Sequence, residues 1–481
     1  MEQNKRGSWG SNFGFLMAAV GSAEGLGNIW GFPYKMGKNG GFAVLLVYLV
    51  LVVLVGVVVM LGELALGRKT GKGAVGAYAA FAKKHKWVGM MGVVSGFLIL
   101  SFYSVLGGMV MRYMFGFLLQ LLGLDGFAAQ GTGFFGFLLY DYGGMLFFYA
   151  VFMIINIIIV MGGIEKGIES FSKIAMPALF FILLFVIIYV AFQPGAAAGY
   201  AFMFKPDLSA FQGGNFLTVL KTAAGQMFFS LSLGMGCMIT YGSYLNKKEN
   251  LQRNSIIIPV ADTLIAIMAG MAVMPACAAF GVDFGKGPGL VFVSMQQVFI
   301  NMGSFGNFVG FMFYFLVFIA AITSSISLLE VVTAYQIDKN IDKGKEPQRK
   351  KVTCLYALVI FVVGLPVALD ALGSTGAVIK APFELLGFEL GGAGYAMWND
   401  CWLDIYDMVS EGILMPLGAL VMSLLIGWNF KPQTIIDECE QSGHKFKGRK
   451  YFEVCFKYVV PIIMVFVLFG QIVDFFGLKL F

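Results

Sequence analysis

Long apolar runs recur throughout this chain, and they limit its fold more than any other feature of the sequence. Eleven segments approach or exceed the roughly 20 apolar residues that a helix needs to cross a bilayer. In hydrocarbon, backbone N–H and C=O groups must be paired within the protein, which favours helices for such segments. With 59% hydrophobic and 12% charged residues, the sequence predicts an all-α polytopic membrane protein embedded in the lipid bilayer, with a single domain over residues 1–481.

The expected spans follow the apolar runs along the chain. They are residues 12–36, 41–66, 88–122, 145–161, 174–192, 217–244, 256–280, 305–337, 352–369, 403–428 and 458–476. A further apolar run at 290–300 is too short to span, and we expect a helix that lies over the outer mouth. The Gly- and Ala-rich segment 370–402 is expected to be a mobile cap.

Basic residues gather in alternate loops, such as 68–86 and 339–351, and the loops between them carry few. The positive-inside rule therefore predicts a cytoplasmic N-terminus, and the odd number of spans puts the C-terminus outside the cell. We expect a multi-pass protein of the cell membrane (inner or plasma). Because the net charge of +6 sits in these short loops, nucleic acid is not an expected partner. The sequence leaves the oligomeric state open.

Signals for an enzyme are weak. Residues 67–72 resemble a phosphate-binding loop, but their spacing is short by one residue and no strand precedes them. His85 and His444 show no metal-ligand spacing. The six cysteines are scattered and are expected to be mostly free thiols. We therefore do not expect an enzyme.

The first span has an unusual polar centre, Gly21–Asn28, with three glycines, an acid and an asparagine. An unwound turn there would free carbonyls for a cation and N–H groups for an anion such as a carboxylate. The sixth span repeats the pattern at residues 229–236. Interrupted helices at matching positions of two five-span halves indicate an inverted-repeat transporter with its site at the midplane, although close packing of small residues is an alternative. The halves are expected at about 12–192 and 217–428, with an extra helix at about 458–476.

Polar side chains inside other spans favour the same interpretation. Thr323 and Ser324 adjoin a small-residue turn in span eight and could supply neutral oxygens to Na⁺. Asp262, early in span seven, is the best candidate for a carboxylate that balances a cation. Glu63 is better explained as a hydrogen-bonding brace. Tyr103 is either a core residue or a donor to a substrate carboxylate.

Several of these segments resemble the neurotransmitter:sodium symporter family. The resemblance lies in residues 9–11, 19–23, 25–28, 32–33, 225–234 and 323–325, and it extends over nearly the whole chain. It implies the bacterial eleven-helix type of amino-acid transporter: a five-plus-five inverted repeat with broken helices 1 and 6, plus an eleventh helix.

The resemblance also implies two sodium sites. The first would use the Ala23 carbonyl, the side chains of Asn28 and Ser230, and the carboxylate of the substrate; Asp262 stands where the family has an asparagine. The second would use carbonyls and hydroxyls from spans one and eight. These are the carbonyls of Gly21, Glu24 and Ala320 and the hydroxyls of Thr323 and Ser324.

The implied substrate is an amino acid, because Gly25 leaves room for a carboxylate where monoamine transporters have aspartate. Its carboxylate would meet the N–H groups of Leu26 and Gly27 and the Tyr103 hydroxyl. Its ammonium would meet carbonyls of Ala23, Phe229, Ser230 and Ser232. The side-chain pocket would be Ile99, Tyr103, Phe229, Ser232, Met235, Ser324 and Leu328. This largely apolar pocket predicts a neutral, hydrophobic or medium-sized amino acid.

Two further expectations concern charge. Asp262 would supply the fixed charge that chloride supplies in animal members of the family, so chloride is not expected as a cofactor. The inner gate of the family is matched by Arg6 and Trp9 facing Asp338. In the outer gate Asp407 is matched, but Gly31 stands in place of the arginine. Either Lys35 or Lys38 replaces it, or the gate closes without this ion pair. Glu24, where the family has a small apolar residue, either adds a charge or titrates.

Three alternatives remain. The first is a symporter of the same fold for taurine or another small amine. The second is a membrane protein that binds a ligand without transporting it. A channel is less favoured, because the polar residues cluster at one depth rather than line a path.

Overall fold

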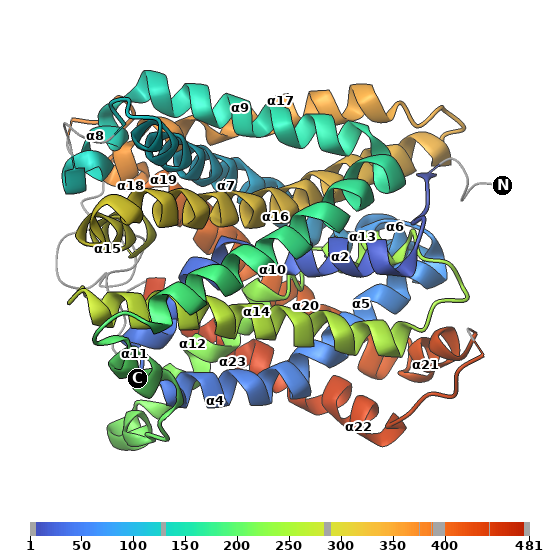
Figure 1. The fold of residues 1–481 in the computed structure, drawn as a ribbon. Helices are drawn as coiled ribbons and strands as arrows, with labels where there is room; N and C mark the ends of the chain where they lie inside the picture. Colours follow the sequence, from blue (N-terminus) through green and yellow to red (C-terminus); the bar gives the residue numbers. More distant parts are fainter. Residues whose placement is uncertain are drawn as a thin grey trace.

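The computed structural model describes residues 6–126, 131–282, 290–374, 376–385, 387, 400–441 and 443–475. Every regular element in this part of the chain is helical, and the helices form one bundle (Figure 1). The α-helices up to the sixth span are α2 (Asn12–Ala23), α3 (Phe32–Lys38), α4 (Phe42–Leu51), α5 (Val57–Thr70), α6 (Ala74–Phe81), α7 (Lys86–Leu121), α8 (Phe134–Tyr140), α9 (Tyr142–Met161), α10 (Ser170–Ala191), α11 (Ala196–Phe204), α12 (Phe216–Ser230) and α13 (Cys237–Gly242). Those that follow are α14 (Leu251–Ala279), α15 (Met295–Asn301), α16 (Gly306–Asp342), α17 (Arg349–Leu369), α18 (Pro382–Leu385), α19 (Trp402–Asp407), α20 (Met415–Leu424), α21 (Gln433–Glu440), α22 (Arg449–Val454) and α23 (Val460–Phe475).

The eleven expected spans are all present as helices. Within the described residues, nine helical segments are long and apolar enough to cross a membrane. The first and sixth spans are the two that are interrupted, α2 with α3 and α12 with α13. The predicted fold class is therefore confirmed. The fifth span begins at Ile164 and the seventh at Leu251, earlier than expected, because polar residues continue these helices beyond their apolar runs.

Two smaller expectations have different outcomes. The apolar run at 290–300 is helical, as a π-helical turn Leu290–Ser294 that leads into α15; its place over an outer mouth stays a prediction. Of the expected cap at 370–402, residues 375, 386 and 388–399 lie outside the described residues. The described part contains a short helical turn, Ala371–Gly373, and α18; its mobility stays a prediction.

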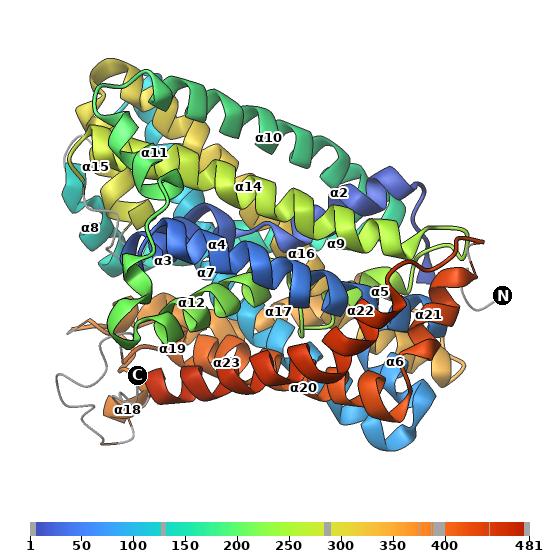
Figure 2. The same ribbon diagram turned by 90° about the horizontal axis from the view of Figure 1, so that it is seen from below.

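The two longest helices run through the middle of the bundle. α7 and α16 contain 36 and 37 residues and pack against each other along much of their length. α2 packs against α10, α14 and α16. α2 and α3 lie toward opposite ends of the bundle, as Figure 2 shows, so the break between them falls near its centre.

A buried arginine ties the C-terminal part of the chain to the bundle. Arg68, at the end of α5, is 0% exposed, and its Nε donates to the Glu438 carboxylate of α21 at 2.8 Å. The same guanidinium donates to the carbonyl oxygens of Glu249 and Glu438. Lys247 Nζ also lies 2.9 Å from this carboxylate. Three separate segments therefore meet on one guanidinium.

Candidate substrate and cation site

The break in the first helix is a short stretch that only small residues can form. α2 ends at Ala23, Glu24 is extended (φ −88°, ψ 104°), and the chain resumes as a π-helical turn, Gly27–Gly31, before α3. A Cβ atom on Gly25 would lie 2.6 Å from the Tyr103 hydroxyl oxygen, and one on Gly27 would lie 2.3 Å from the Phe229 ring. These glycines allow α7 and α12 to approach the backbone of the break closely.

The break in the sixth helix depends on left-handed residues. α12 ends at Ser230, and Ser232, Gly234 and Gly236 have φ values of 52°, 82° and 77° before α13 begins. The Gly234 N–H donates to Glu63 Oε1 at 2.7 Å, so the brace expected of Glu63 is confirmed. Ser232 is not glycine, and a strained non-glycine residue of this kind is typical of functional sites. Its hydroxyl donates to the Ser22 carbonyl at 2.8 Å and joins the two breaks.

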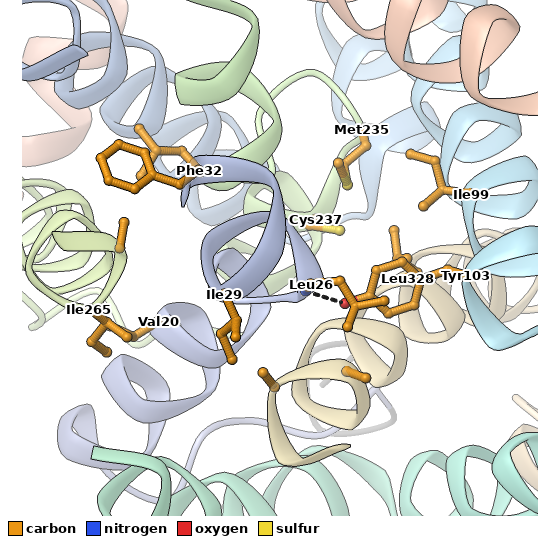
Figure 3. Packing of buried hydrophobic residues seen from close by; sticks show 14 of the residues in the cluster. Val20, Leu26, Ile29, Phe32, Ile99, Tyr103, Met235, Cys237, Ile265 and Leu328 are labelled. Atoms are coloured by element: carbon orange, nitrogen blue, oxygen red, sulfur yellow. Dashed lines mark hydrogen bonds between the residues drawn. The ribbon is translucent and has the colours of Figure 1, made fainter. Parts of the chain in front are cut away.

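A small cavity lies between the two breaks. It is lined by Ser22, Ala23, Gly25, Gly27, Ile99, Tyr103, Phe229, Ser232, Met235, Ser324 and Leu328. Figure 3 shows Ile99, Met235 and Leu328 on the same side of the broken segment as Tyr103. The wall combines apolar side chains with a few hydroxyl and backbone groups, which is typical of sites for small solutes.

Most of the predicted substrate residues line this cavity, with two exceptions. Leu26 lines a neighbouring opening instead, and its N–H donates to the Tyr103 hydroxyl at 3.0 Å. Ser230 belongs to a polar cluster beside the cavity. Ser22, which was not predicted as a substrate residue, is part of the wall. Its position within the polar stretch Gly21–Asn28 could have indicated this.

The predicted first sodium set forms one tight oxygen cluster. The Ser230 hydroxyl oxygen lies 2.6 Å from Asn28 Oδ1 and 2.7 Å from Asp262 Oδ2. The Asn28 amide donates to Asp262 Oδ1 at 2.6 Å. The Tyr48 hydroxyl, 3.4 Å from both Ser230 Oγ and Asp262 Oδ2, joins the cluster. Tyr48 lies in a long apolar run, so nothing in the sequence indicated that it belongs to a polar site.

The second predicted set meets on Ser324 of α16. The Ser324 hydroxyl oxygen lies 3.2, 3.2 and 3.0 Å from the carbonyl oxygens of Gly21, Ser22 and Glu24. The hydroxyl of the adjacent Thr323 donates to the Ala320 carbonyl, about one turn earlier, at 3.1 Å. Both sets consist of oxygens, which hard cations such as Na⁺ prefer. No group of three or more His, Cys, Asp or Glu residues that would suit a transition metal occurs in the described ranges.

Comparisons with known proteins agree with this arrangement. The model of the sodium:neurotransmitter symporter family matches residues 6–125 and 138–381. The chain belongs to this family. It is therefore a sodium-dependent membrane symporter and not an enzyme.

The similarity to individual members extends over the whole chain. An uncharacterized sodium-dependent transporter of Bacillus subtilis, YhdH, is 34% identical over 98% of this chain and 99% of its own. One of Haemophilus influenzae is 32% identical over 97% and 98%. The crystal structure of MhsT in complex with L-phenylalanine has a TM-score of 0.82 and 36% identity, covering 97% of this chain and all of that one.

One end of this symporter is closed by contact ion pairs, which we call the Arg6 end. Arg6 Nε lies 2.6 Å from Asp338 Oδ1, and the Gly73 N–H donates to the same carboxylate at 2.7 Å. The Trp9 indole N–H donates to the Tyr241 carbonyl at 3.0 Å. The three residues predicted for the inner gate thus lie together at one end of the bundle.

A second ion pair reinforces the Arg6 end. Glu330 of α16 is fully buried and accepts two hydrogen bonds from the Arg349 guanidinium, at 2.6 and 2.9 Å. The Tyr244 hydroxyl donates to Glu330 at 2.6 Å, and the Arg6 guanidinium lies 4.8 Å from the centre of the Tyr244 ring. The two ion pairs are therefore adjacent through Tyr244.

The opposite side of the cavity faces a wide opening, which we call the Lys35 vestibule. Its walls include Leu26, Tyr103 and Phe229 next to the cavity, and Lys35, Asp407 and Glu411 farther out. The carboxyl groups of Asp407 and Glu411 are within hydrogen-bonding reach of each other, and the charge of Lys35 acts on both. Lys35 Nζ lies 6.0 Å from the centre of the Phe229 ring. In the part of the chain that the structure describes, Lys35 makes no contact ion pair with either acid.

Proposed function

We propose that this protein imports a neutral, hydrophobic amino acid together with Na⁺, by alternating access in the cell membrane. The observation that carries the proposal is the cavity between the two breaks. One edge of it is unwound backbone, and its wall is formed largely by Ile99, Phe229, Met235 and Leu328. The complex of MhsT with L-phenylalanine supports the same class of substrate.

The backbone of the first break is suited to the carboxylate of an amino acid. The N–H groups of Leu26 and Gly27 begin a helical segment, where partial positive charge favours an anion. The Tyr103 hydroxyl, already 3.0 Å from the Leu26 nitrogen, would donate to the same carboxylate. The carbonyls of Ala23, Phe229, Ser230 and Ser232 would accept from the ammonium group.

Two Na⁺ ions would bind beside the substrate. The Asn28, Ser230 and Asp262 cluster, with the Ala23 carbonyl and the substrate carboxylate, would hold the first. The carbonyls of Gly21, Glu24 and Ala320, with Thr323 and Ser324, would hold the second. Each Na⁺ that enters releases about 2.3 kcal/mol per 100 mV of membrane potential and about 1.4 kcal/mol per tenfold gradient.

Chloride would not be required for transport. The Asp262 carboxylate is 0% exposed and lies within the first cluster, where it would supply a fixed negative charge. We expect that replacing external chloride by gluconate leaves the rate of uptake unchanged. An abolished uptake would contradict this part of the proposal.

The gates would lie at the two ends already described. Arg6, Trp9 and Asp338 would close the cytoplasmic end, with the N-terminus inside the cell and the C-terminus outside. Asp407 and Glu411 would close the outer end with Lys35, which is favoured over Lys38 because its charge acts on both acids and because it lies near Phe229. The five-span halves at about 12–192 and 217–428 would move relative to each other.

Uptake by the purified protein in sealed proteoliposomes tests the proposed function. We expect an inward Na⁺ gradient to drive accumulation of labelled phenylalanine, leucine or another apolar amino acid, and dissipation of the gradient to stop it. A panel with taurine, glutamate and lysine provides controls for the substrate class. Binding of an amino acid without Na⁺-dependent accumulation would indicate a receptor instead.

A further inference from the structure

Glu24 is a buried acid at the break in the first helix. The residue is 0% exposed, and among the described residues neither of its carboxyl oxygens has a hydrogen-bond partner. Buried acids in membrane proteins are costly and are usually paired or functional. Glu63 and Glu330, which are also buried acids inside spans, both have partners. Glu24 differs from them in lacking one.

In the part of the chain that the structure describes, no cationic side chain forms an ion pair with Glu24. The charge that acts on it is another carboxylate, Asp262 of α14. Two basic residues on or next to helices that pack against α2 are engaged elsewhere: Lys173 of α10 lies 2.6 Å from Glu169, and Arg349 lies 2.6 Å from Glu330 of α16. Two carboxylates thus share the core of the molecule, and each needs a counter-charge when it is ionised.

The backbone next to Glu24 offers oxygens for a cation. The carbonyl oxygens of Gly21, Ser22 and Glu24 all lie within 3.2 Å of Ser324 Oγ. These oxygens are neutral, so a cation held by them alone would remain an uncompensated charge away from water. The Glu24 carboxylate is carried by a residue of this same turn, and in the described ranges it accepts no hydrogen bond.

We infer that the Glu24 carboxylate is the fixed counter-charge for the Na⁺ held at Ser324, as Asp262 is for the Na⁺ held at Ser230. This inference rests on the proposed function and deepens it. The binding centre then carries two negative charges and becomes neutral when two monovalent cations are bound. The number of coupling ions is thus set by two acids of this chain.

Equilibrium binding of radioactive Na⁺ to the purified full-length protein tests this inference, with added phenylalanine to complete the first site. We expect the wild-type protein to bind two ions. In Glu24→Gln, one of the two should bind at least tenfold more weakly, which corresponds to about 1.4 kcal/mol. The control Glu24→Asp keeps the charge and should bind both ions within threefold of the wild-type affinity. The Na⁺-dependent rise in Tm should be smaller in Glu24→Gln and unchanged in Glu24→Asp.

Two-ion binding with unchanged affinity in Glu24→Gln would overturn the inference and leave Glu24 a neutral, structural residue. If Glu24→Gln does not fold, Glu24→Asp alone decides: loss of one ion in that charged variant contradicts a role as counter-charge. A wild-type protein that binds no Na⁺ would contradict the proposed function itself, so the two failures are distinguishable.

Discussion

The two ends of this symporter carry ion pairs of different kinds. At the Arg6 end, Arg6 and Asp338 are in contact at 2.6 Å, and their side chains are only 6% and 8% exposed. In the Lys35 vestibule, the charge of one lysine acts on two acids without a contact ion pair. The structure is therefore closed at the Arg6 end and open at the other.

This difference indicates which interactions hold the observed state. A buried contact pair that loses one partner leaves an uncompensated charge, at a cost of about 3–5 kcal/mol. Exposed pairs contribute about 0–1 kcal/mol each. We therefore expect substitutions at the Arg6 end to shift the conformational equilibrium, and substitutions in the vestibule to affect mainly the closing step.

The largest effect is expected for Arg6→Ala, which would leave Asp338 buried with the Gly73 N–H as its remaining contact. A loss of about 3 kcal/mol would open the Arg6 end and lower Na⁺-driven uptake about 100-fold. Uptake in proteoliposomes measures this. Maleimide labelling of Cys237, which is fully buried, should increase in a variant that keeps only this cysteine. Normal uptake by Arg6→Ala would show that the buried ion pair at the Arg6 end matters no more than the charges in the vestibule.

Glu330→Gln sharpens the comparison within the Arg6 end. The amide can still accept from Arg349 and Tyr244, but the Arg349 charge loses its counter-ion. Because the Arg349 side chain is 16% exposed, water compensates part of the loss, and we expect uptake to fall about tenfold. Tyr244→Phe, which removes one hydrogen bond and no charge, is the matched control and should fall less.

Lys35→Ala tests the vestibule, with Lys38→Ala as its control. We expect about a fivefold loss of uptake for Lys35→Ala, the equivalent of about 1 kcal/mol for a partly exposed pair. Lys38→Ala should stay within twofold, because Lys35 is the lysine whose charge acts on both Asp407 and Glu411. Equal losses in both variants would contradict the choice of Lys35.

Ionic strength should have the smallest effect. Between 0.1 and 1 M salt the Debye length falls from about 10 Å to about 3 Å, which weakens interactions across the vestibule but not buried contacts. At constant Na⁺, added choline chloride should lower wild-type uptake about twofold and leave the uptake by Lys35→Ala unchanged. An equal decrease for the wild type and for Lys35→Ala would show that the salt effect does not act through Lys35.

The sequence predicted the interrupted helices because glycines and polar residues stand where only apolar residues would otherwise be expected, as at Gly25, Gly27 and Asn28. It also predicted that Asp262 and Ser230 belong to one site, through the family resemblance. It could not predict that Tyr48 joins them, because one tyrosine in an apolar run looks like any core residue.

The sequence likewise could not show which of Lys35 and Lys38 lies near the two acids. Both lysines lie on α3, and only the position of α19 and the following π-helical turn Met408–Leu414 shows which one faces Asp407 and Glu411. Short helices such as α6 and α21 were missed for another reason. Each of them has 8 residues, which is only about two helical turns, and this is too short for an amphipathic pattern to be recognised.

The guanidinium of Arg68 has a practical consequence for anyone who shortens this protein. A truncated version that stops after the tenth span would lack Glu438 and leave a fully buried positive charge with Glu249 as its remaining described acceptor. We expect such a version to be degraded during expression, although the deleted segment does not line the cavity between the two breaks. A purification tag should therefore be added after α23, and it should not replace the segment that contains α21.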